Sequence, residues 1–354
     1  MMNIKLATVL FLLSAGALVS AAENATVREL PPLPRPVTNN AVVAVRTDAN
    51  EYIISFAGLG EGRGHADTLA VTYVFSGDSN RWAEAGAVPG GVGRLAAVAA
   101  TAGNLAYVFG GYTVAADGSE ISMAWVHSFD PMTGIFEERQ SMPVPVDDAV
   151  AISYDDRYIF LISGWHDFGN VNLVQRYDTQ TDSWAQATPT PGRGVFGHSG
   201  GIVGNTIVYC DGVAVLPHTD RRRDFGANNE CFQGLIDPDN SRRIDWRRLS
   251  PHPGMPRYRM AAAGIDELNS MVFVGGSDNP YNYDGIGYNG EPSQPVTDIL
   301  RFDLEQQSWT TLAADAAASM DHRALVGFGG AWLTVGGMLA DQRVTDRVVA
   351  YELE

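Results

Sequence analysis

Short apolar segments recur along the chain, and each is followed by a step that contains glycine. Tyr52–Phe56, Leu105–Phe109, Tyr158–Ile162, Met271–Val274 and Trp332–Val335 are such segments, each four or five residues long. Apolar runs of this length that end at glycine are typical of β-strands, and no useful helical periodicity follows residue 22. In chain order the steps are Ala57-Gly58, Gly110-Gly111, Ser163-Gly164, Asp211-Gly212, Gly275-Gly276 and Gly336-Gly337.

Paired large side chains follow most of these steps at a constant spacing. The pairs seven residues apart are Phe75 and Trp82, Phe129 and Phe136, Tyr177 and Trp184, and Phe302 and Trp309. In the fourth copy the interval stretches to ten residues, from Ile236 to Trp246, and the sixth copy ends at Tyr351. The predicted inner strands begin near Asn39, Arg94, Asp147, Gly197, Tyr258 and His322, which are 50 to 64 residues apart. This interval accommodates four short strands and their turns.

Four-stranded sheets repeated at a fixed period predict a β-propeller. Six copies predict an all-β, six-bladed propeller that forms a single domain over residues 22–354. The last copy has only 33 residues from His322 to Glu354 and lacks a fourth strand. The segment Thr26–Pro34 is similar to the fourth strands of the other copies. We therefore expect the N-terminal strand to complete the C-terminal blade, which closes the ring and leaves no open edge at the seam.

The glycine steps, the aromatic pairs and their spacing resemble kelch-repeat β-propellers over residues 25–354. The resemblance implies a six-bladed kelch-type fold closed by the N-terminal strand. The copies have diverged, because Ala57, Ser163 and Asp211 replace the first glycine of a step and Phe136 replaces a tryptophan. Galactose oxidases, which are copper-radical enzymes with kelch propellers, need a cysteine-linked tyrosine and further Tyr and His ligands. This chain has no matching motif, so we expect no metal and no other cofactor.

The N-terminal residues and the net charge indicate where the protein is located and which partners it can bind. Lys5 precedes the apolar run Leu6–Val19 and small residues before Ala22, so residues 1–21 are typical of a secretory signal peptide. The run is short for a membrane span, and an uncleaved anchor is the alternative. We expect a periplasmic or secreted protein with no integral span after cleavage. The net charge of −17, with Lys5 as the only lysine, argues against a nucleic-acid partner.

Both cysteines of the chain fall in the fourth copy. Cys210 ends its predicted second strand and Cys231 begins its third, after a loop. Adjacent antiparallel strands bring such positions together, so we expect a disulfide in an oxidising compartment. Two buried thiols are the alternative. A metal site is not indicated, because the two cysteines lie far apart in the sequence.

Polar side chains gather near the starts of the inner strands and in the loops after the glycine steps. In a propeller these positions converge on one face, at the mouth of the axial channel, where a small polar ligand would bind. The residues expected to hold its anionic or hydroxyl groups are Arg94, Arg193, Arg257 and Arg323. The long segment Asn279–Pro295 is expected to form a lid or stacking wall through Tyr281, Tyr283 and Tyr288. Two alternatives stay open: arginines that lock neighbouring blades together, and a loop that only plugs the channel.

Two histidines are the catalytic candidates at this face. His198 and His322 both lie near inner-strand starts. Histidine titrates near neutral pH and can donate or accept a proton during catalysis. Structural hydrogen bonding is the alternative role for both.

The signal peptide, six blades and N-terminal closing strand resemble the periplasmic N-acetylneuraminate mutarotases, kelch propellers that interconvert sialic acid anomers. This resemblance implies a small sugar or sugar acid at the axial mouth and an isomerase that uses an acid/base pair and an arginine. Those enzymes carry a glutamate just after the glycine step of blade four. Here that place reads Cys-Asp-Gly-Val-Ala from Cys210, and the nearest acids are Asp211 and Asp220. The alternative function is a non-catalytic propeller that binds a glycan or a protein.

Overall fold

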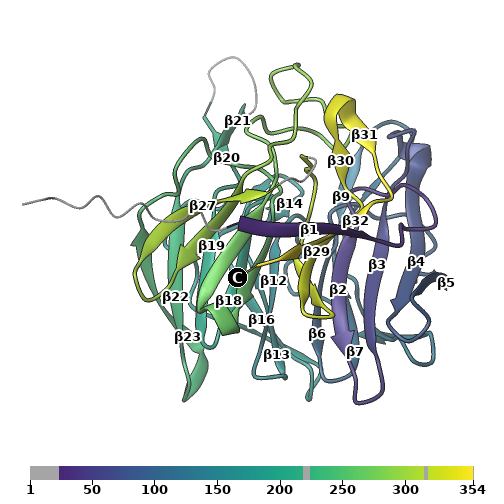
Figure 1. Ribbon diagram of the computed structural model, residues 1–354, viewed down its shortest axis with the longest axis horizontal. Coiled ribbons are helices and arrows are strands. Elements are labelled where there is room, and N and C mark those ends of the chain that lie inside the picture. Colours follow the sequence, from purple (N-terminus) through teal and green to yellow (C-terminus); the bar gives the residue numbers. More distant parts are fainter. Residues whose placement is uncertain (1–23, 218–223, 315–317, 354) are drawn as a thin grey trace, which may run out of the picture.

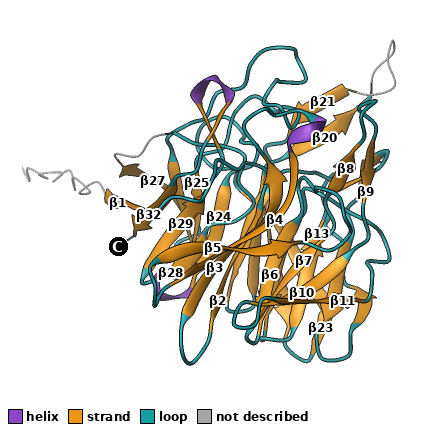
Figure 2. Cartoon of the chain, turned by 90° about the vertical axis from the view of Figure 1, so that its right-hand side faces the viewer, coloured by secondary structure: helices purple, strands orange, loops and turns teal. Residues whose placement is uncertain are grey.

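The computed structural model describes residues 24–217, 224–314 and 318–353, and Figure 1 shows the β-sheets that they form. Strands dominate these residues, and the few helical turns in Figure 2 are short 3₁₀ helices. The predicted signal peptide, residues 1–21, lies outside the described ranges. Within those ranges no helix has both the length and the apolar character needed to cross a membrane.

The described residues form six blades of four antiparallel strands each, and the sheets of the last two blades are continuous with each other. Blade 1 contains β2 (Ala41–Arg46), β3 (Glu51–Leu59), β4 (Thr68–Ser76) and β5 (Arg81–Ala87). Blade 2 contains β6 (Val98–Ala102), β7 (Leu105–Phe109), β10 (Val126–Asp130) and β11 (Ile135–Arg139). Blade 3 contains β12 (Val150–Tyr154), β13 (Tyr158–Ile162), β16 (Val174–Asp178) and β17 (Ser183–Gln186).

The remaining blades follow the same order. Blade 4 contains β18 (Ser199–Val203), β19 (Thr206–Cys210), β22 (Cys231–Asp237) and β23 (Asn240–Leu249). Blade 5 contains β24 (Ala261–Ile265), β25 (Ser270–Val274), β26 (Ile299–Asp303) and β27 (Ser308–Ala314). Blade 6 contains β28 (Val326–Phe328), β29 (Ala331–Val335), β32 (Val348–Glu352) and β1 (Asn24–Leu30).

The seam of the ring confirms the predicted closure. β1 is antiparallel to β32, with Thr26 opposite Glu352 and Leu30 opposite Val348. Figure 1 shows the purple N-terminal strand beside the yellow C-terminal strands. The start of β1 also pairs in parallel with β27 of blade 5, through Asn24 opposite Ala313. The chain termini therefore supply adjacent strands of one blade, and the last blade has no open edge.

Small hairpins extend several blades beyond their sheets. They connect the second and third strands, so they stand on the face where the second strands end. The hairpins are β8 (Tyr112–Val114) with β9 (Glu120–Ser122), β14 (Trp165–His166) with β15 (Gly169–Asn170), β20 (Val213–Leu216) with β21 (Asp224–Ala227), and β30 (Met338–Leu339) with β31 (Arg343–Val344). They raise a wall around one end of the channel.

The backbone conformation explains the glycine steps. The first residue of every step has φ between 53° and 67°, in the left-handed region that Ala57, Ser163 and Asp211 can still adopt. The second residue has φ between 81° and 110° and is glycine in all six blades. A Cβ on Gly58 would lie 2.6 Å from the Thr38 carbonyl oxygen. The second position therefore requires glycine, while the first tolerates replacement.

The aromatic pairs are cross-strand neighbours on the two outer strands of a blade. Phe75 lies opposite Trp82, and Phe302 lies opposite Trp309 at a ring-centroid distance of 4.8 Å. The indole N–H of each outer-strand tryptophan donates to a backbone carbonyl that follows the outer strand of the preceding blade. These bonds are Trp82 to Pro31, Trp184 to Gln140, Trp246 to Thr188 and Trp309 to Ser250, at 2.8 to 3.1 Å. Tryptophan therefore joins blades as well as filling the space between them.

Blade 4 departs from the predicted pairing. Trp246 lies opposite Gly234, and Ile236 lies opposite Ile244. The register shifts between Ile236 and Asp237, which absorbs the longer interval in the sequence. Trp246 still fills the space between two blades, as the other tryptophans do, and its ring packs edge-on against Tyr209 of its own blade.

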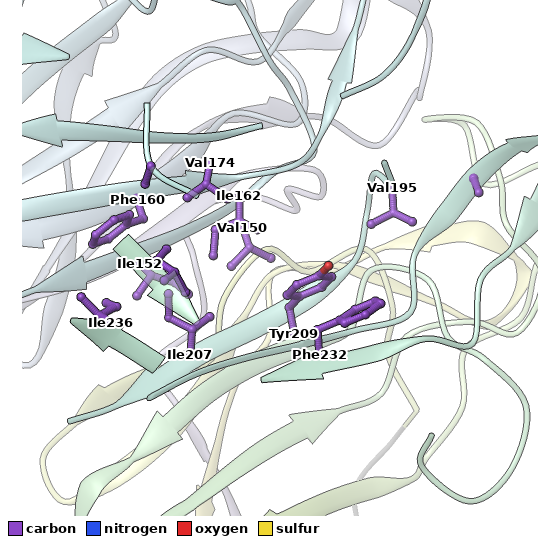
Figure 3. Packing of buried hydrophobic residues seen from close by; sticks show 13 residues of the cluster. Val150, Ile152, Phe160, Ile162, Val174, Val195, Ile207, Tyr209, Phe232 and Ile236 are labelled. Carbon is purple, nitrogen blue, oxygen red and sulfur yellow. The ribbon is translucent and has the colours of Figure 1, made fainter. Parts of the chain in front are cut away.

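The hydrophobic core lies between the blades. Between blades 3 and 4, for example, Phe160 and Ile162 face Ile207 and Tyr209, and all four side chains are at most 1% exposed (Figure 3). Equivalent clusters occupy the other interfaces. Each blade is therefore stabilised by its neighbours, and the ring depends on every blade.

The structure confirms the disulfide between Cys210 and Cys231. Cys210 is the last residue of β19, Cys231 is the first residue of β22, and the two are opposite each other in the ladder with Cα atoms 4.1 Å apart. The bond closes a 21-residue interval that contains the β20–β21 hairpin. It therefore holds that hairpin at its base.

Removing the disulfide should lower the free energy of unfolding by about 3 kcal/mol, because the open chain gains loop entropy when it unfolds. The test compares urea unfolding of the oxidised chain with that of a Cys210→Ala, Cys231→Ala double variant, with and without a reducing agent. The reducing agent should destabilise the parent chain and leave the variant unchanged. Equal stability of both chains under oxidising conditions would contradict the prediction.

Candidate functional site

One residue per blade turns the chain toward the channel axis just before the inner strand. These residues are Asn39, Ala96, Asp148, Gly197, Arg259 and Asp321, and all have φ between 50° and 68°. Backbone hydrogen bonds join several of them around the ring, such as Gly197 N–H to Asp148 at 2.9 Å and Arg259 N–H to Gly197 at 2.8 Å. The side chains at these positions therefore meet at the axis.

Two arginines and two aspartates form a buried ion network there. Arg259 donates hydrogen bonds to Asp148 and, at 2.9 Å, to Asp321. Arg323 lies 2.9 Å from Asp148 and 3.3 Å from Asp321. Burial opposes ionisation, yet Arg259 and Arg323 hold the pKa of Asp321 below its ordinary value. Thr38 Oγ1 also donates to Asp321 at 2.6 Å, so the network connects blades 1, 3, 5 and 6.

Above this network, the mouth contains a cavity with two lobes. The first lobe, ≈ 120 Å³, is mainly aromatic and is lined by Tyr112, Glu120, Asp147, Asp148, Trp165, Phe196, Phe225, Arg259, Asn282, Tyr283 and Tyr288. The second lobe, ≈ 200 Å³, is more polar and is lined by Tyr112, Gly118, Glu120, Ser122, Asp147, Trp165 and Asp167. Four residues line both lobes, namely Tyr112, Glu120, Asp147 and Trp165. The lobes are therefore adjacent parts of one site.

The aromatic lobe has a wall of mutually packed rings. Phe225 of β21 stacks on Tyr288 at a ring-centroid distance of 4.3 Å, and Trp165 of β14 contacts Phe196 at 5.4 Å. Phe196 and Phe225 are 5.8 Å apart. Because these rings come from three different blades, the wall exists only in the closed propeller.

The long loop of blade 5 contributes Tyr288 to this wall. Tyr283 and Tyr288 line the cavity, while Tyr281 is fully buried and packs edge-on against Tyr258 at 5.0 Å. The loop is fixed at two points. Arg63 of blade 1 donates to the carbonyl oxygen of Asp284, and Gln342 of blade 6 donates to that of Ser293 at 2.7 Å. The loop therefore spans part of the mouth.

Asp147 is the most unusual acid of the cavity. Its side chain is only 3% exposed, and it accepts a 2.6 Å hydrogen bond from Ser122 Oγ of β9. Burial raises the pKa of Asp147 well above its ordinary value, and the neighbouring carboxylates of Asp148 and Glu120 raise it further. A carboxyl group with a raised pKa keeps its proton to a higher pH than an ordinary carboxyl group and can transfer it to a bound molecule.

Asp147 was expected among the polar residues at the inner-strand starts, but no catalytic role was predicted for it, and Glu120 was not predicted. The available signal was the tandem Asp147-Asp148 at an inner-strand start, where two carboxylates are forced close together. Both aspartates line the aromatic lobe, and the sequence did not show that Asp148 also belongs to the ion network while Asp147 accepts a hydrogen bond from Ser122. The difference arises because Asp148 has φ 50° and Asp147 forms an extended bridge with Trp165.

The four predicted ligand-binding arginines lie apart from this cavity. Arg94 is 1% exposed and donates to the Gly110 carbonyl oxygen at 3.1 Å, and burial lowers its pKa to about 10. Arg257 forms a 2.6 Å ion pair with Asp298, and Arg323 belongs to the axial network. Arg193 lines a separate open cavity of ≈ 460 Å³ beside the β20 strand. The described structure does not bring the four together.

The two predicted catalytic histidines are buried below the mouth. His198 and His322 are each 5% exposed, and neither lines the cavity. Burial lowers the pKa of both to about 4, so both are neutral at pH 7. His322 Nε2 lies 2.9 Å from Ser319 Oγ, and both residues are buried. Neither histidine lines the cavity, and both ring nitrogens of His198 lack a hydrogen-bond partner among the described residues.

Asp211, the acid at the position indicated by the mutarotase resemblance, is fully buried. Its Oδ2 atom lies 2.6 Å from His252 Nε2 and accepts a 2.6 Å hydrogen bond from the Arg257 N–H. Because both ring nitrogens of His252 face oxygen atoms, the pKa of His252 is raised despite burial. Asp211 thus joins blade 4 to blade 5. Asp220 lies outside the described residues.

A larger cavity opens at the opposite end of the channel. It measures ≈ 480 Å³ and is lined by the turns of the inner hairpins. Its carboxylates join neighbouring blades, since Asp156 accepts from Gly103 N–H at 2.6 Å and Asp266 accepts from Gly204 N–H at 2.9 Å. No group of three or more His, Cys, Asp or Glu side chains in the described ranges is arranged to hold a metal ion. The mouth is the better candidate site, because its cavity combines an aromatic wall with a buried carboxyl group.

Comparisons with known proteins agree with this architecture. Residues 93–143 match the Kelch motif. Kelch-like protein 15 of Danio rerio is 25% identical over 251 residues, which cover 71% of this chain and 40% of that protein, so the chain spans less than half of its relative. The solved structure of YjhT covers 91% of this chain and 96% of its own, with a TM-score of 0.71 and 18% identity. The fold of this chain is a six-bladed, kelch-type β-propeller.

Proposed function

We propose that this propeller binds a small sugar in the two-lobed cavity at its axial mouth. The supporting observation is the combination of a packed aromatic wall with carboxyl and hydroxyl groups in one cavity. The apolar face of a sugar ring packs on aromatic side chains, and its hydroxyl groups donate to carboxylates such as Glu120. A sugar acid is supported less well, because Arg259, the arginine among the described lining residues, is already paired with Asp148 and Asp321.

Isomerisation of the bound sugar is the second part of the proposal. Interconversion of anomers requires that the ring oxygen gains a proton as its bond to the anomeric carbon breaks. It also requires that the anomeric hydroxyl loses its proton. Both protons return when the ring closes on the other face. Asp147 is the candidate donor and acceptor, because it lines both lobes and burial raises its pKa. Export from the cytosol remains part of the proposal, and the disulfide supports it.

Asp147→Asn should lower any catalysed anomeric exchange by at least about a hundredfold, because general acid/base catalysis is typically worth that factor or more. The affinity for the same sugar should change little, because the amide keeps the size of the side chain. A panel of monosaccharides is first tested for binding by ligand-observed NMR, and exchange is then measured for each hit. Asp245→Asn, on the outer strand β23, is the matched control. Unchanged exchange in Asp147→Asn would contradict the assignment.

A non-catalytic role in binding a glycan or a protein is the second candidate. Phe168 and Ile121 are 71% and 58% exposed, and they are next to the lining residues Asp167, Glu120 and Ser122. Exposed apolar side chains at the rim of a cavity favour a larger partner. Sugar binding without any acceleration of anomeric exchange in the parent chain would favour this candidate.

A further inference from the structure

Blade 6 has a tryptophan at a position that is closed in every other blade. Four residues before the glycine step, the other blades have aliphatic or methionine side chains that are fully buried. These residues are Ile53, Ala106, Ile159, Ile207 and Met271, each 0% exposed. Trp332 takes this position on β29, and it is partly exposed. Packing between blades therefore does not require a tryptophan here.

The Trp332 ring lies where the core of blades 5 and 6 meets the cavity at the end of the channel opposite to the mouth. It packs against the cluster that contains Ile265 and Val349, and it lines the ≈ 480 Å³ cavity. Gly327 lies opposite Trp332 in the ladder, and a Cβ on Gly327 would be 3.4 Å from the ring. Because glycine has no side chain to cover the ring, Trp332 borders the cavity.

Small residues of the inner strands keep this end of the channel open. In blades 1, 2, 5 and 6, the inner-strand residue opposite the position of Trp332 lines the cavity. These residues are Ala44, Thr101, Gly264 and Gly327. A volume of ≈ 480 Å³ falls within the range of about 300–1,000 Å³ that is typical of small-molecule sites. An open space of suitable size therefore adjoins the aromatic ring.

Polar groups that have no partner among the described residues border the same cavity. Glu267, in the 3₁₀ helix Asp266–Leu268, is exposed, and its carboxylate has no hydrogen bond or ion pair within the described ranges. Arg46 donates through Nε to Glu51 at 2.5 Å, while its two terminal nitrogens have no acceptor in the part of the chain that is described. The cavity thus offers donors and an acceptor beside an aromatic ring.

We propose that this cavity is a second ligand site, which takes the neutral, hydroxylated ring of a sugar. The apolar face of the ring packs on Trp332, while its hydroxyl groups accept from Arg46 and donate to Glu267. Hydroxyl groups satisfy both partners because each of them donates and accepts, which an apolar ring cannot do. The site lies at the opposite end of the channel from the mouth, so it does not depend on the proposed function.

Fluorine NMR of the full chain labelled with 5-fluorotryptophan provides the test. The chain has seven tryptophans, and the resonances of Trp332 and Trp165 are assigned by their loss in Trp332→Phe and Trp165→Phe variants. The methyl glycosides of glucose, galactose, mannose and N-acetylglucosamine are titrated, with cyclohexanol as a ring of similar size that has one hydroxyl group. We expect at least one glycoside to shift the Trp332 resonance to saturation, and cyclohexanol to bind at least about tenfold more weakly.

Two variants tie the binding to this cavity. Trp332→Ile introduces the side chain that blades 1, 3 and 4 have at this position, so the melting temperature should stay within about 3 °C of that of the parent chain. Calorimetry should show glycoside binding at this site weakened by at least about tenfold. Glu267→Ala should weaken it by about three- to tenfold, as measured on the Trp332 resonance. The matched control is Glu305→Ala, in the outer hairpin of the same blade, which should change nothing.

The two assigned resonances separate this inference from the proposed function, because Trp165 lines the mouth. A glycoside that shifts Trp165 and not Trp332 would overturn the second site and support the mouth. A shift of Trp332 alone would support the second site and contradict the proposed function, and a shift of neither would overturn both. Equal affinity for cyclohexanol and the glycosides, or unchanged affinity in both Trp332→Ile and Glu267→Ala, would also overturn the second sugar site.

Discussion

A chain that begins at Arg35 should lose most or all of its cooperative folding, because it lacks the outer strand of blade 6. The missing residues include β1, whose ladder with β32 runs from Thr26 to Leu30, and Leu33, which is 2% exposed. They also include the Pro31 carbonyl that accepts the Trp82 indole N–H at 2.9 Å. Each buried apolar side chain contributes about 1.5–3 kcal/mol, and whole domains are stable by only about 5–15 kcal/mol.

We expect the melting temperature to fall by more than about 10 °C, or the cooperative transition to disappear. A chain that begins at Asn24 keeps β1 and should melt within about 2 °C of the full chain. A synthetic peptide covering residues 24–34 should raise the melting temperature of the shortened chain by restoring the blade edge. An unchanged melt of the chain that begins at Arg35 would show that β1 does not close the ring.

The fold was predictable because its requirements are local and repeat six times. The second glycine of each step must adopt φ above 80°, and the aromatic pairs must lie opposite each other on adjacent strands. Both constraints require particular residues, glycine or a large aromatic residue, at a fixed spacing in the sequence. The exception is blade 4, where the register shift after Ile236 moved the partner of Trp246 to Gly234. There the longer interval in the sequence marked an irregularity, but it did not show which residue would lie opposite Trp246.

The site was less predictable, because depth along the channel is set by contacts between distant blades. His198 and His322 share the predicted face with the cavity, yet both lie below it with a pKa of about 4. Phe225 of the aromatic wall comes from a hairpin that reads as a loop, held in place by its packing on Tyr288. Neighbouring positions such as Asp147 and Asp148 take different roles because one backbone angle separates them. The positions of the predicted arginines along the channel could not be derived from the sequence for the same reason.

Arg323→Ala should lower the free energy of unfolding by about 3–5 kcal/mol, because it breaks a buried ion network. The Arg323 side chain is 3% exposed and contacts Asp148 and Asp321, which are 2% and 0% exposed. Without it, Arg259 alone would compensate two buried carboxylates. The matched control is Arg347→Ala, which removes a more exposed ion pair with Glu29 and should cost at most about 1 kcal/mol.

The same variant decides between two roles for this arginine. If Arg323 holds the ligand, as the sequence alone leads one to expect, truncating it would weaken ligand binding about ten- to a hundredfold. The geometry instead predicts that the folded variant keeps its affinity within about twofold, because Arg323 does not line the cavity. If the alanine variant fails to fold, Arg323→Lys retains the charge, and both stability and ligand affinity can be measured on it. A loss of affinity without a loss of stability would place Arg323 in the ligand site and would require the mouth to extend down to the axial network.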